Sequence, residues 1–247
     1  MKETISIVNQ KGGTGKTTTS VNLASAMVSE GMRVLVIDFD PQGNLSYCFG
    51  VDPDGDTIAN VLKGDISLKD AIVVSESVHI VPANISLADL EISLVAEIGR
   101  EFYLKKALDT VEGYDYIIID CPPSLSLLAI NALVASDAVV VPMQMEVMSL
   151  QGLNQIQSTI QKINSSYNKS IYIKGILPVM VDHRRNLDGE VEGFIKENYN
   201  IPLFESRIRT NVRASEAPSF GKSVISYAPK SNSAMDYINF ASELIKL

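Results

Sequence analysis

The sequence predicts an α/β fold: a doubly wound, mostly parallel sheet with helices on both faces. Three β-branched runs carry this prediction, namely VLVID at 34–38, YIIID at 116–120 and AVVVP at 138–142. Each run is continuously apolar rather than alternating, which is typical of strands buried on both faces of a parallel sheet. Longer stretches of helical character separate the runs. Because no linker or repeat interrupts the chain, we expect one domain over residues 1–247.

Composition narrows the class of protein. The chain has 46% hydrophobic residues and a net charge of −8. Its overall charge therefore does not favour a protein that covers nucleic acid, although a local basic patch stays possible. No run of about 18 apolar residues and no export signal stands out. Cys48 and Cys121 lie far apart without a nearby His or Cys partner, which argues against a zinc site. We therefore expect a cytoplasmic protein.

The first predicted strand starts near residue 4 and contains the apolar residues Ile5, Ile7 and Val8. It leads into the glycine-rich stretch NQKGGTGKTTT and then into a helix that stops near Gly31. A strand, a glycine-rich turn and a helix aim backbone N–H groups and the positive helix end at one point, which favours an anion. The pattern G-x-x-x-x-G-K-[ST] is met at Gly15, Lys16 and Thr17, with Gln10 in place of its first glycine. The stretch predicts a phosphate site.

Acidic residues follow two of the later strands. Asp38 closes the run at 34–38, with Asp40 two residues beyond it, and Asp120 closes the run at 116–120. Ligands of open α/β sheets bind at the carboxyl ends of strands, so these residues should meet the phosphate loop at one edge. A strand-end Asp can also cap the next turn or helix. Next to a phosphate loop, however, it indicates a carboxylate that supports Mg²⁺.

Four motifs together resemble a known family in their order and spacing. They are K-G-G-T-G-K-T at 11–17, D-F-D-P-Q-G-N at 38–44, D-C-P-P-S at 120–124 and TNVRASEAPSFGKSV at 210–224. The chain resembles the deviant Walker A ATPases, which include ParA, Soj and MinD, and most of all the short ParA/Soj group. The resemblance covers nearly the whole chain. It implies a P-loop NTPase fold and a Mg-dependent ATPase with ATP and Mg²⁺ as cofactors.

The resemblance also implies a role for each site residue. Lys16 would hold the phosphates of its own nucleotide, whereas Lys11 would cross to the γ-phosphate of the partner subunit in an ATP-dependent homodimer. Asp40 would position the attacking water, which makes it the third catalytic residue. The implied metal residues are Thr17, Asp38 and Asp120. The implied nucleotide contacts are Lys11, Gly12, Gly13, Thr14, Gly15, Lys16, Thr17, Thr18, Met180 and Asn211. This chain has Arg209-Thr210-Asn211 where many relatives have Pro-Arg-Asn, so its base pocket departs from the family pattern.

A cluster of basic residues suggests which molecule the ATP-dependent dimer binds. It comprises His183, Arg184, Arg185, Arg207, Arg209, Arg213, Lys222 and Lys230. Such a cluster is usually a solvated face, but by resemblance Arg184 and Arg213 align with arginines that bind DNA nonspecifically. The implied function is chromosome or plasmid partitioning on the nucleoid, with a ParB-like centromere-binding protein as partner.

The family includes two other functional classes. Electron transfer through a shared metal cluster needs two suitably placed cysteines, and Cys121 lies beside the Mg²⁺ acid instead. A MinD-like ATPase that positions a protein cluster or a membrane assembly stays open as the alternative. The C-terminal segment SAMDYINFASELIKL favours core docking because it has one basic residue and a wide apolar stripe, so we expect no membrane contact. The stripe comprises Met235, Ile238, Phe240, Ala241, Leu244 and Ile245.

Overall fold

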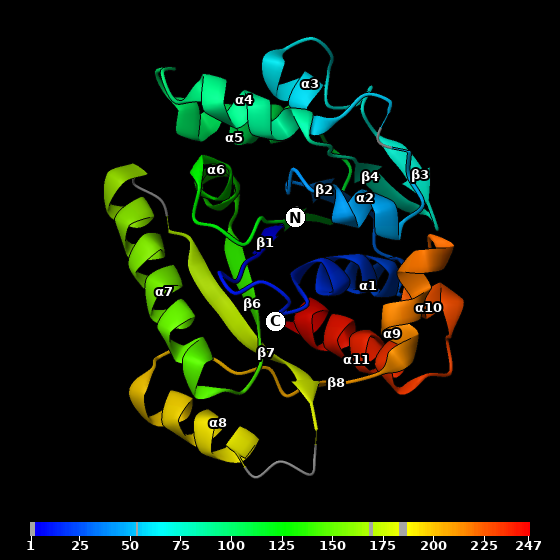
Figure 1. The fold of residues 1–247 in the computed structure, drawn as a ribbon, viewed down its shortest axis with the longest axis vertical. Helices are drawn as coiled ribbons and strands as arrows, with labels where there is room; N and C mark the ends of the chain where they lie inside the picture. The colour runs from blue at the N-terminus through cyan, green and yellow to red at the C-terminus, as the bar shows by residue number, and fades with distance from the viewer. Residues whose placement is uncertain (1–2, 53, 168–169, 183–186) are drawn as a thin grey trace.

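The computed structural model describes residues 3–52, 54–167, 170–182 and 187–247. Across these residues eight strands form one sheet (Figure 1): β1 (Glu3–Ile7), β2 (Val34–Asp38), β3 (Val73–Ser75), β4 (Val78–Val81), β5 (Tyr116–Asp120), β6 (Ala138–Met143), β7 (Tyr172–Val181) and β8 (Ile208–Arg209). The strand order is β3-β4-β2-β5-β1-β6-β7-β8. Every neighbouring pair is parallel except β3 and β4, which confirms the predicted mostly parallel sheet.

Helices cover both faces of the sheet. Their bounds are α1 (Lys16–Ser29), α2 (Asn44–Cys48), α3 (Ile58–Lys63), α4 (Ser86–Leu94), α5 (Tyr103–Leu108), α6 (Leu127–Ala135), α7 (Val147–Tyr167), α8 (Leu187–Asn198), α9 (Val212–Glu216), α10 (Val224–Tyr227) and α11 (Asn232–Lys246), with 3-10 turns at Arg100–Phe102 and Ala217–Phe220. In Figure 1, α1 and α11 lie on one side of the sheet, and α6 and α7 lie on the other. The doubly wound class is therefore confirmed.

The buried strands explain why the sequence runs were continuously apolar. In β2, Leu35 and Ile37 join the core on the face of α3 to α8. Val34 and Val36 point to the opposite face and join the core beneath α1 and α11. Successive side chains of a strand face opposite ways, so a strand covered on both faces needs apolar residues at every position. A single domain over residues 1–247 stays a prediction. The single sheet, whose strands come from residues 3 to 209, agrees with it.

Element boundaries agree closely with the sequence runs. The run at 34–38 is β2 and the run at 116–120 is β5, without any shift of their bounds. The first strand lies at Glu3–Ile7, so it begins within one residue of the expected start, and it ends just before Val8. α1 ends at Ser29, and Gly31 follows with φ of 86°, a left-handed value that glycine adopts without strain.

The C-terminal helix α11 docks on the core, as the sequence predicted. Its buried side includes Tyr237, Phe240 and Leu244. Met235, which the periodicity placed on the docked stripe, is 46% exposed instead. None of the helices in the described part of the chain is long and apolar enough to cross a bilayer.

Candidate nucleotide-binding site

The phosphate loop lies between β1 and α1 and is shaped by two left-handed glycines. Gly13 has φ of 73°, and Gly15, the N-cap of α1, has φ of 75°. No side chain caps the first turn of α1, so its N–H groups face the adjoining hollow. This cavity of about 300 Å³ is lined by Gly12, Gly13, Thr14, Gly15, Lys16, Thr17, Thr18, Asp40, Gln42, Asn44 and Pro123. The structure thus brings the predicted loop residues and Asp40 to one cavity.

The strand register sets the two strand-end carboxylates side by side. Asp120 pairs with Asp38 in the ladder of β2 and β5, and it pairs with Ile7 at the end of β1. Both carboxylates are fully buried. The predicted meeting of the strand ends with the loop is therefore confirmed by the register.

Hydroxyl groups of α1 hold Asp120. Thr17 donates to Asp120 Oδ2 at 2.7 Å, and Ser20 donates to Oδ1 at 2.8 Å. Burial raises the pKa of Asp120 to about 6, although these hydrogen bonds and the charge of Lys16 oppose that rise. Ser20 was not predicted, but it lies three residues after Thr17 and so shares a face of α1, a signal that helical periodicity carries.

Asp38 is held from the other side by α2. The backbone N–H and the hydroxyl of Ser46 donate to Asp38 Oδ2 at 2.9 and 2.7 Å, and the N–H of Asp40 donates to Oδ1 at 3.3 Å. Burial, followed by the charge of Asp120, raises the pKa of Asp38 to about 7. Ser46 was also missed, and no motif in the sequence distinguishes it.

Two buried carboxylates beside the Thr17 hydroxyl suit a divalent cation, because a cation would stabilise both in their charged form. In the described part of the chain, no three Asp, Glu, His or Cys side chains form a metal site by themselves. Mg²⁺ fits this arrangement, since it keeps several waters and takes oxygen ligands from phosphates rather than from an all-protein cage.

The two lysines of the loop point to different places. Lys16 is buried, and its Nζ lies 3.4 Å from the carbonyl oxygen of Lys11. Burial lowers the pKa of Lys16, and the charge of Asp120 opposes this. Lys11 has a side chain 44% exposed, and its Nζ contacts Glu146 Oε2 at 3.0 Å and Gln144 Oε1 at 3.3 Å. Lys16 therefore lines the cavity beside the predicted phosphate loop, here called the phosphate cavity, whereas Lys11 lies at the surface beside the start of α7.

A second cavity of about 320 Å³ continues from the phosphate cavity, with which it shares Gly15 and Thr18. Met180 and Asn211 line it, as predicted for the base contacts, and Tyr237 lines it as well. Met180 has φ of 55° and accepts a hydrogen bond from the Gln144 side chain through its sulfur. The Asn211 side chain caps α9 by accepting from the N–H of Arg213 at 2.8 Å.

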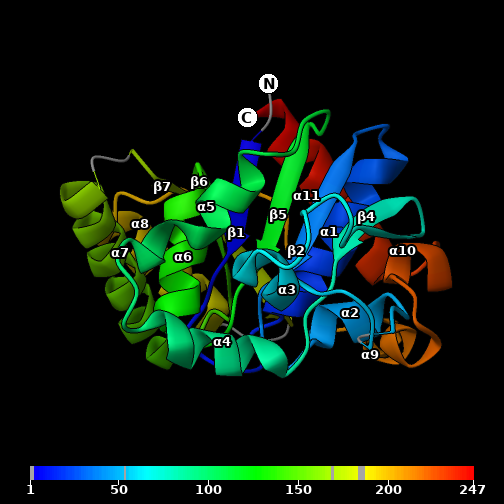
Figure 2. The ribbon, with the colours of Figure 1, turned by 90° about the horizontal axis from the view of Figure 1, so that it is seen from above.

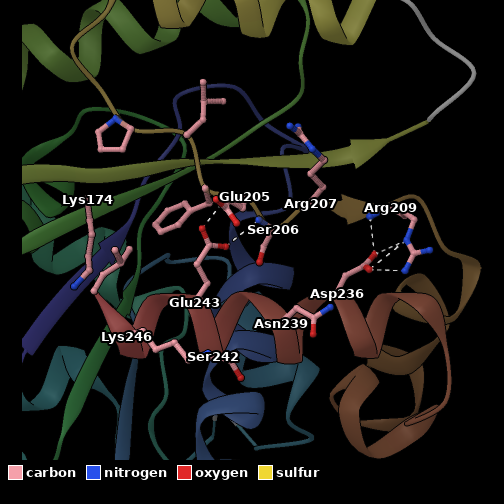
Figure 3. A pocket seen from close by; sticks show the side chains of 14 residues that line it. Lys174, Glu205, Ser206, Arg207, Arg209, Asp236, Asn239, Ser242, Glu243 and Lys246 are labelled. Carbon is pink, nitrogen blue, oxygen red and sulfur yellow. Dashed lines mark hydrogen bonds and ion pairs between the residues drawn. The ribbon is translucent and has the colours of Figure 1, made fainter.

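Arg209, in the segment that departs from the family pattern, also lines this second cavity, and its guanidinium group is held by α11. It forms a bidentate ion pair with Asp236 of α11, with Nη2 at 2.6 Å and Nε at 3.0 Å from the two oxygens (Figure 3). A larger cavity of about 880 Å³ lies here, between α11 and residues 202–209, and it shares no lining residue with the phosphate cavity.

Carboxylates of α11 also close the edge of the sheet beside β8 (Figure 3). Glu243 accepts from the N–H groups of Glu205 and Ser206 at 2.7 and 2.9 Å. Asp236 accepts from the N–H of Arg209 at 3.0 Å. These backbone donors are thus satisfied by side chains rather than by a neighbouring strand.

The basic cluster is partly neutralised by ion pairs. Arg207 pairs with Glu192, and Arg213, which is exposed on α9, pairs with Glu216 at 2.7 Å. The hydrogen bond to Glu216 raises the pKa of Arg213. Arg184, the other predicted DNA-binding residue, lies outside the described residues, as do His183 and Arg185.

Comparisons with known proteins agree with this geometry. A family model described as an AAA domain matches residues 2–173. The sporulation initiation inhibitor protein Soj of Bacillus subtilis is 45% identical over 249 residues, which cover 99% of this chain and 98% of Soj. The chromosome partitioning protein ParA of Caulobacter vibrioides is 40% identical, over 98% of this chain and 93% of that protein.

A solved structure shares the fold over the full chain. Cobyrinic acid a,c-diamide synthase from Mycobacterium smegmatis, with bound ADP and magnesium, is 35% identical with a TM-score of 0.87, covering 100% of this chain and 95% of that protein. The loop geometry, the strand-end carboxylates and the full-length relatives lead to one conclusion. The chain belongs to the ParA/Soj family of deviant Walker A ATPases.

Proposed function

We propose that this protein is a Mg-ATP-dependent partition ATPase that dimerises on ATP, binds DNA without sequence preference and releases it on hydrolysis. The observation that carries the proposal is the divergence of the two loop lysines. Lys16 is buried at the phosphate cavity, and Lys11 lies at the surface in reach of Glu146. A surface lysine five residues before the phosphate lysine can reach a nucleotide in a second subunit.

This arrangement makes the nucleotide a switch. A γ-phosphate bound by Lys16 of one subunit and Lys11 of another stabilises the dimer but not the monomer. A ligand shifts the equilibrium between two states only when it binds one of them more strongly than the other. ADP lacks the bridging group, so it leaves the monomer favoured.

Hydrolysis follows from the residues around the phosphate cavity. Thr17, Asp38 and Asp120 would hold Mg²⁺, directly or through water, and the bound ion would neutralise charge on the β- and γ-phosphates. Asp40 lines the same cavity, and its carboxylate can accept a hydrogen bond from a water and orient it in line.

DNA binding is assigned to Arg184 and Arg213. Arg213 is exposed on α9, beside the cavity that Asn211 lines, and its pairing with Glu216 reduces its effect in a single subunit. A dimer presents twice as many arginines, so a chain with net charge −8 holds DNA mainly when ATP is bound. The protein would then work on the nucleoid, in the cytoplasm, with a ParB-like protein that stimulates its ATPase.

The test is a titration of arbitrary duplex DNA with ATP or ADP, over a range of salt concentrations. Wild type should bind with ATP only, and log affinity should fall with log salt by about 0.9 for each phosphate contacted. Arg184→Ala/Arg213→Ala should dimerise normally but bind weakly and with a flatter slope. Lys63→Ala/Lys69→Ala is the matched control, because it removes the same charge from exposed positions elsewhere.

A second arm tests the dimer. Lys11→Ala should bind ATP yet sediment as a monomer and lose DNA binding. Normal dimerisation of this variant contradicts the cross-subunit role. If wild type fails to bind DNA with ATP, partitioning is refuted and the positioning alternative is favoured.

A further inference from the structure

A buried serine near the start of α11 has a hydroxyl group that the protein does not pair. Ser233 is 0% exposed, and its Oγ has no hydrogen-bond partner among the described residues. Buried hydroxyl groups are nearly always hydrogen-bonded, because leaving water without gaining a partner costs free energy. The hydroxyl of Ser233 therefore indicates a partner that comes from outside the chain.

Ser233 lines the second cavity, the one that Met180 and Asn211 also line. This cavity shares Gly15 and Thr18 with the phosphate cavity, so a ligand held by its phosphates at the loop extends into it. Its volume of about 320 Å³ lies at the lower end of the range for small-ligand sites. Ser233 does not line the phosphate cavity, so the part of a nucleotide that it can contact is the nucleoside.

The position of Ser233 in α11 leaves its hydroxyl available. A serine inside a helix can donate to the carbonyl oxygen four residues earlier, as Ser20 does to Lys16 at 3.1 Å. Ser233 is the second residue of α11, so no carbonyl of its own helix lies four residues before it. The N-cap Ser231 accepts from the N–H of Ala234 at 3.2 Å instead. Capping of the helix thus does not use Ser233.

The start of a helix also selects the kind of group that Ser233 meets. The positive end of the helix dipole favours an electron-rich acceptor close to the first turn. Ring nitrogens of a purine are acceptors of this kind, and they carry no hydrogen of their own. A hydroxyl at this place therefore suits the donor role towards a base.

Contacts on the next turn of α11 hold Ser233 in place. The hydroxyl of Tyr237, which is almost fully buried, lies 3.4 Å from Thr19 Oγ1 of α1, and Asp236 holds Arg209 in the bidentate ion pair. α1 and α11 pack side by side (Figure 1 and Figure 2). A donor on a fixed support loses little conformational freedom when it binds a ligand, which favours a specific contact.

We propose that Ser233 is a base-recognition residue, whose hydroxyl donates a hydrogen bond to a ring nitrogen of the purine in the bound nucleotide. Ser233 lies beyond the four sequence motifs, the last of which ends at residue 224. The start of α11 thus adds a contact that those motifs do not include. This inference rests on the proposed function only in taking the ligand to be an adenine nucleotide.

The contact predicts different effects on the free and on the bound protein. In the free protein Ser233→Ala removes no hydrogen bond within the chain, so it should not lower the stability. In the bound protein it removes one hydrogen bond to an uncharged acceptor, which should weaken binding by about threefold to tenfold. A serine with a purely structural role would instead lower the stability and leave the affinity unchanged.

The test is calorimetric titration of the full-length protein with ADP and Mg²⁺. ADP is chosen because the proposed dimer needs ATP, so dimerisation does not enter the measured affinity. The probes are 1-deaza-ADP, 3-deaza-ADP and 7-deaza-ADP, each of which replaces one ring nitrogen by C–H. Ser233→Ala should bind ADP about threefold to tenfold more weakly than wild type does. One of the three analogues should bind equally to both proteins, and it identifies the nitrogen that Ser233 contacts.

Two controls separate this contact from other effects. Ser126→Ala removes another buried hydroxyl that has no partner among the described residues and lines neither cavity, so it should bind ADP as wild type does. The probe 2′-deoxy-ADP keeps the base, so Ser233→Ala should bind it more weakly by the same factor as ADP. Urea unfolding without nucleotide should show both variants to be at least as stable as wild type.

Three results overturn the inference: equal binding of ADP by wild type and Ser233→Ala, the same loss with ADP and with all three deaza analogues, or a loss that disappears with 2′-deoxy-ADP. Binding of DNA by wild type with ATP, measured on the same preparation, separates the two proposals. If DNA binding holds and one of these results is found, this inference fails alone. If Ser233→Ala behaves as predicted and wild type does not bind DNA, the base contact stands and partitioning is refuted.

Discussion

Near neutral pH, Asp38→Asn should make the nucleotide-free protein more stable, and its stability relative to wild type should increase as the pH rises. Asp38 is fully buried, and its pKa of about 7 lies above the value of 3.8 for an ordinary carboxyl. The folded protein therefore binds more protons than the unfolded chain between about pH 4 and pH 7, so its stability falls as the pH rises through this window. Asparagine carries no charge and removes this dependence.

The magnitude follows from the shift. About three pKa units at 1.36 kcal/mol each give an upper limit of about 4 kcal/mol above pH 7. Part of this gain is lost, because the N–H of Asp40 donates to Asp38 Oδ1 at 3.3 Å in wild type. In the variant the amide N–H₂ group lies against that N–H, and the hydrogen bond is lost. The cost of the amide does not depend on pH, so we expect a net gain of about 2 kcal/mol above pH 7 and a net loss of about 2 kcal/mol near pH 4.

The assay is urea unfolding in chelator, without nucleotide, across this pH window. Asp54→Asn, which changes an exposed loop carboxylate, is the control for general charge effects. The gain of Asp38→Asn over wild type should rise with pH and then level off above pH 7. Parallel curves for the two proteins would refute a raised pKa at Asp38. Adding Mg²⁺ and nucleotide should stabilise wild type more than the variant, since wild type supplies the carboxylate.

Four further variants probe the loop and its surroundings. Lys16→Ala should abolish ATP binding, measured by calorimetry, and measurable binding contradicts its role. Asp40→Ala should still form the ATP dimer but slow turnover by about a hundredfold or more, and normal turnover reassigns the water-orienting group. Glu146→Gln should change the ATP-dependent dimerisation constant, measured by sedimentation, by no more than about fivefold, because exposed ion pairs contribute little to stability. A larger change would mean that Glu146 has a role in the dimer beyond its ion pair with Lys11. Gly43→Ala should cost about 1–3 kcal/mol in urea unfolding, since φ is 64° and an added Cβ lies 2.8 Å from a backbone oxygen, whereas Gly55→Ala should be neutral.

Most of the sheet and the phosphate loop could be predicted from the sequence because local patterns specify them. The bounds of β2 and β5 follow from continuous apolar runs closed by an Asp. The meeting of Asp38 with Asp120 follows from a general property of parallel sheets, that their carboxyl ends share an edge.

The parts that escaped prediction depend on contacts between distant segments. The Arg209 to Asp236 pair joins residues 27 apart, and the hydroxyl of Ser46 reaches Asp38 only because α2 folds back over β2. Neither contact is indicated by a periodic pattern in the sequence. The exposure of Met235 was likewise mispredicted, since only the packing of α11 decides which side of a broad apolar stripe is buried.

The closed edge beside β8 has a consequence for crowded conditions. An open sheet edge is a template on which another chain can add a strand, and the risk grows with local concentration. Here Asp236 and Glu243, two helical turns apart on α11, already accept the backbone donors that an incoming strand would need. If many copies gather on one stretch of DNA, strand addition at β8 is blocked by the protein's own C-terminal helix. Gathered copies therefore form no strand-to-strand contact at this edge of the sheet.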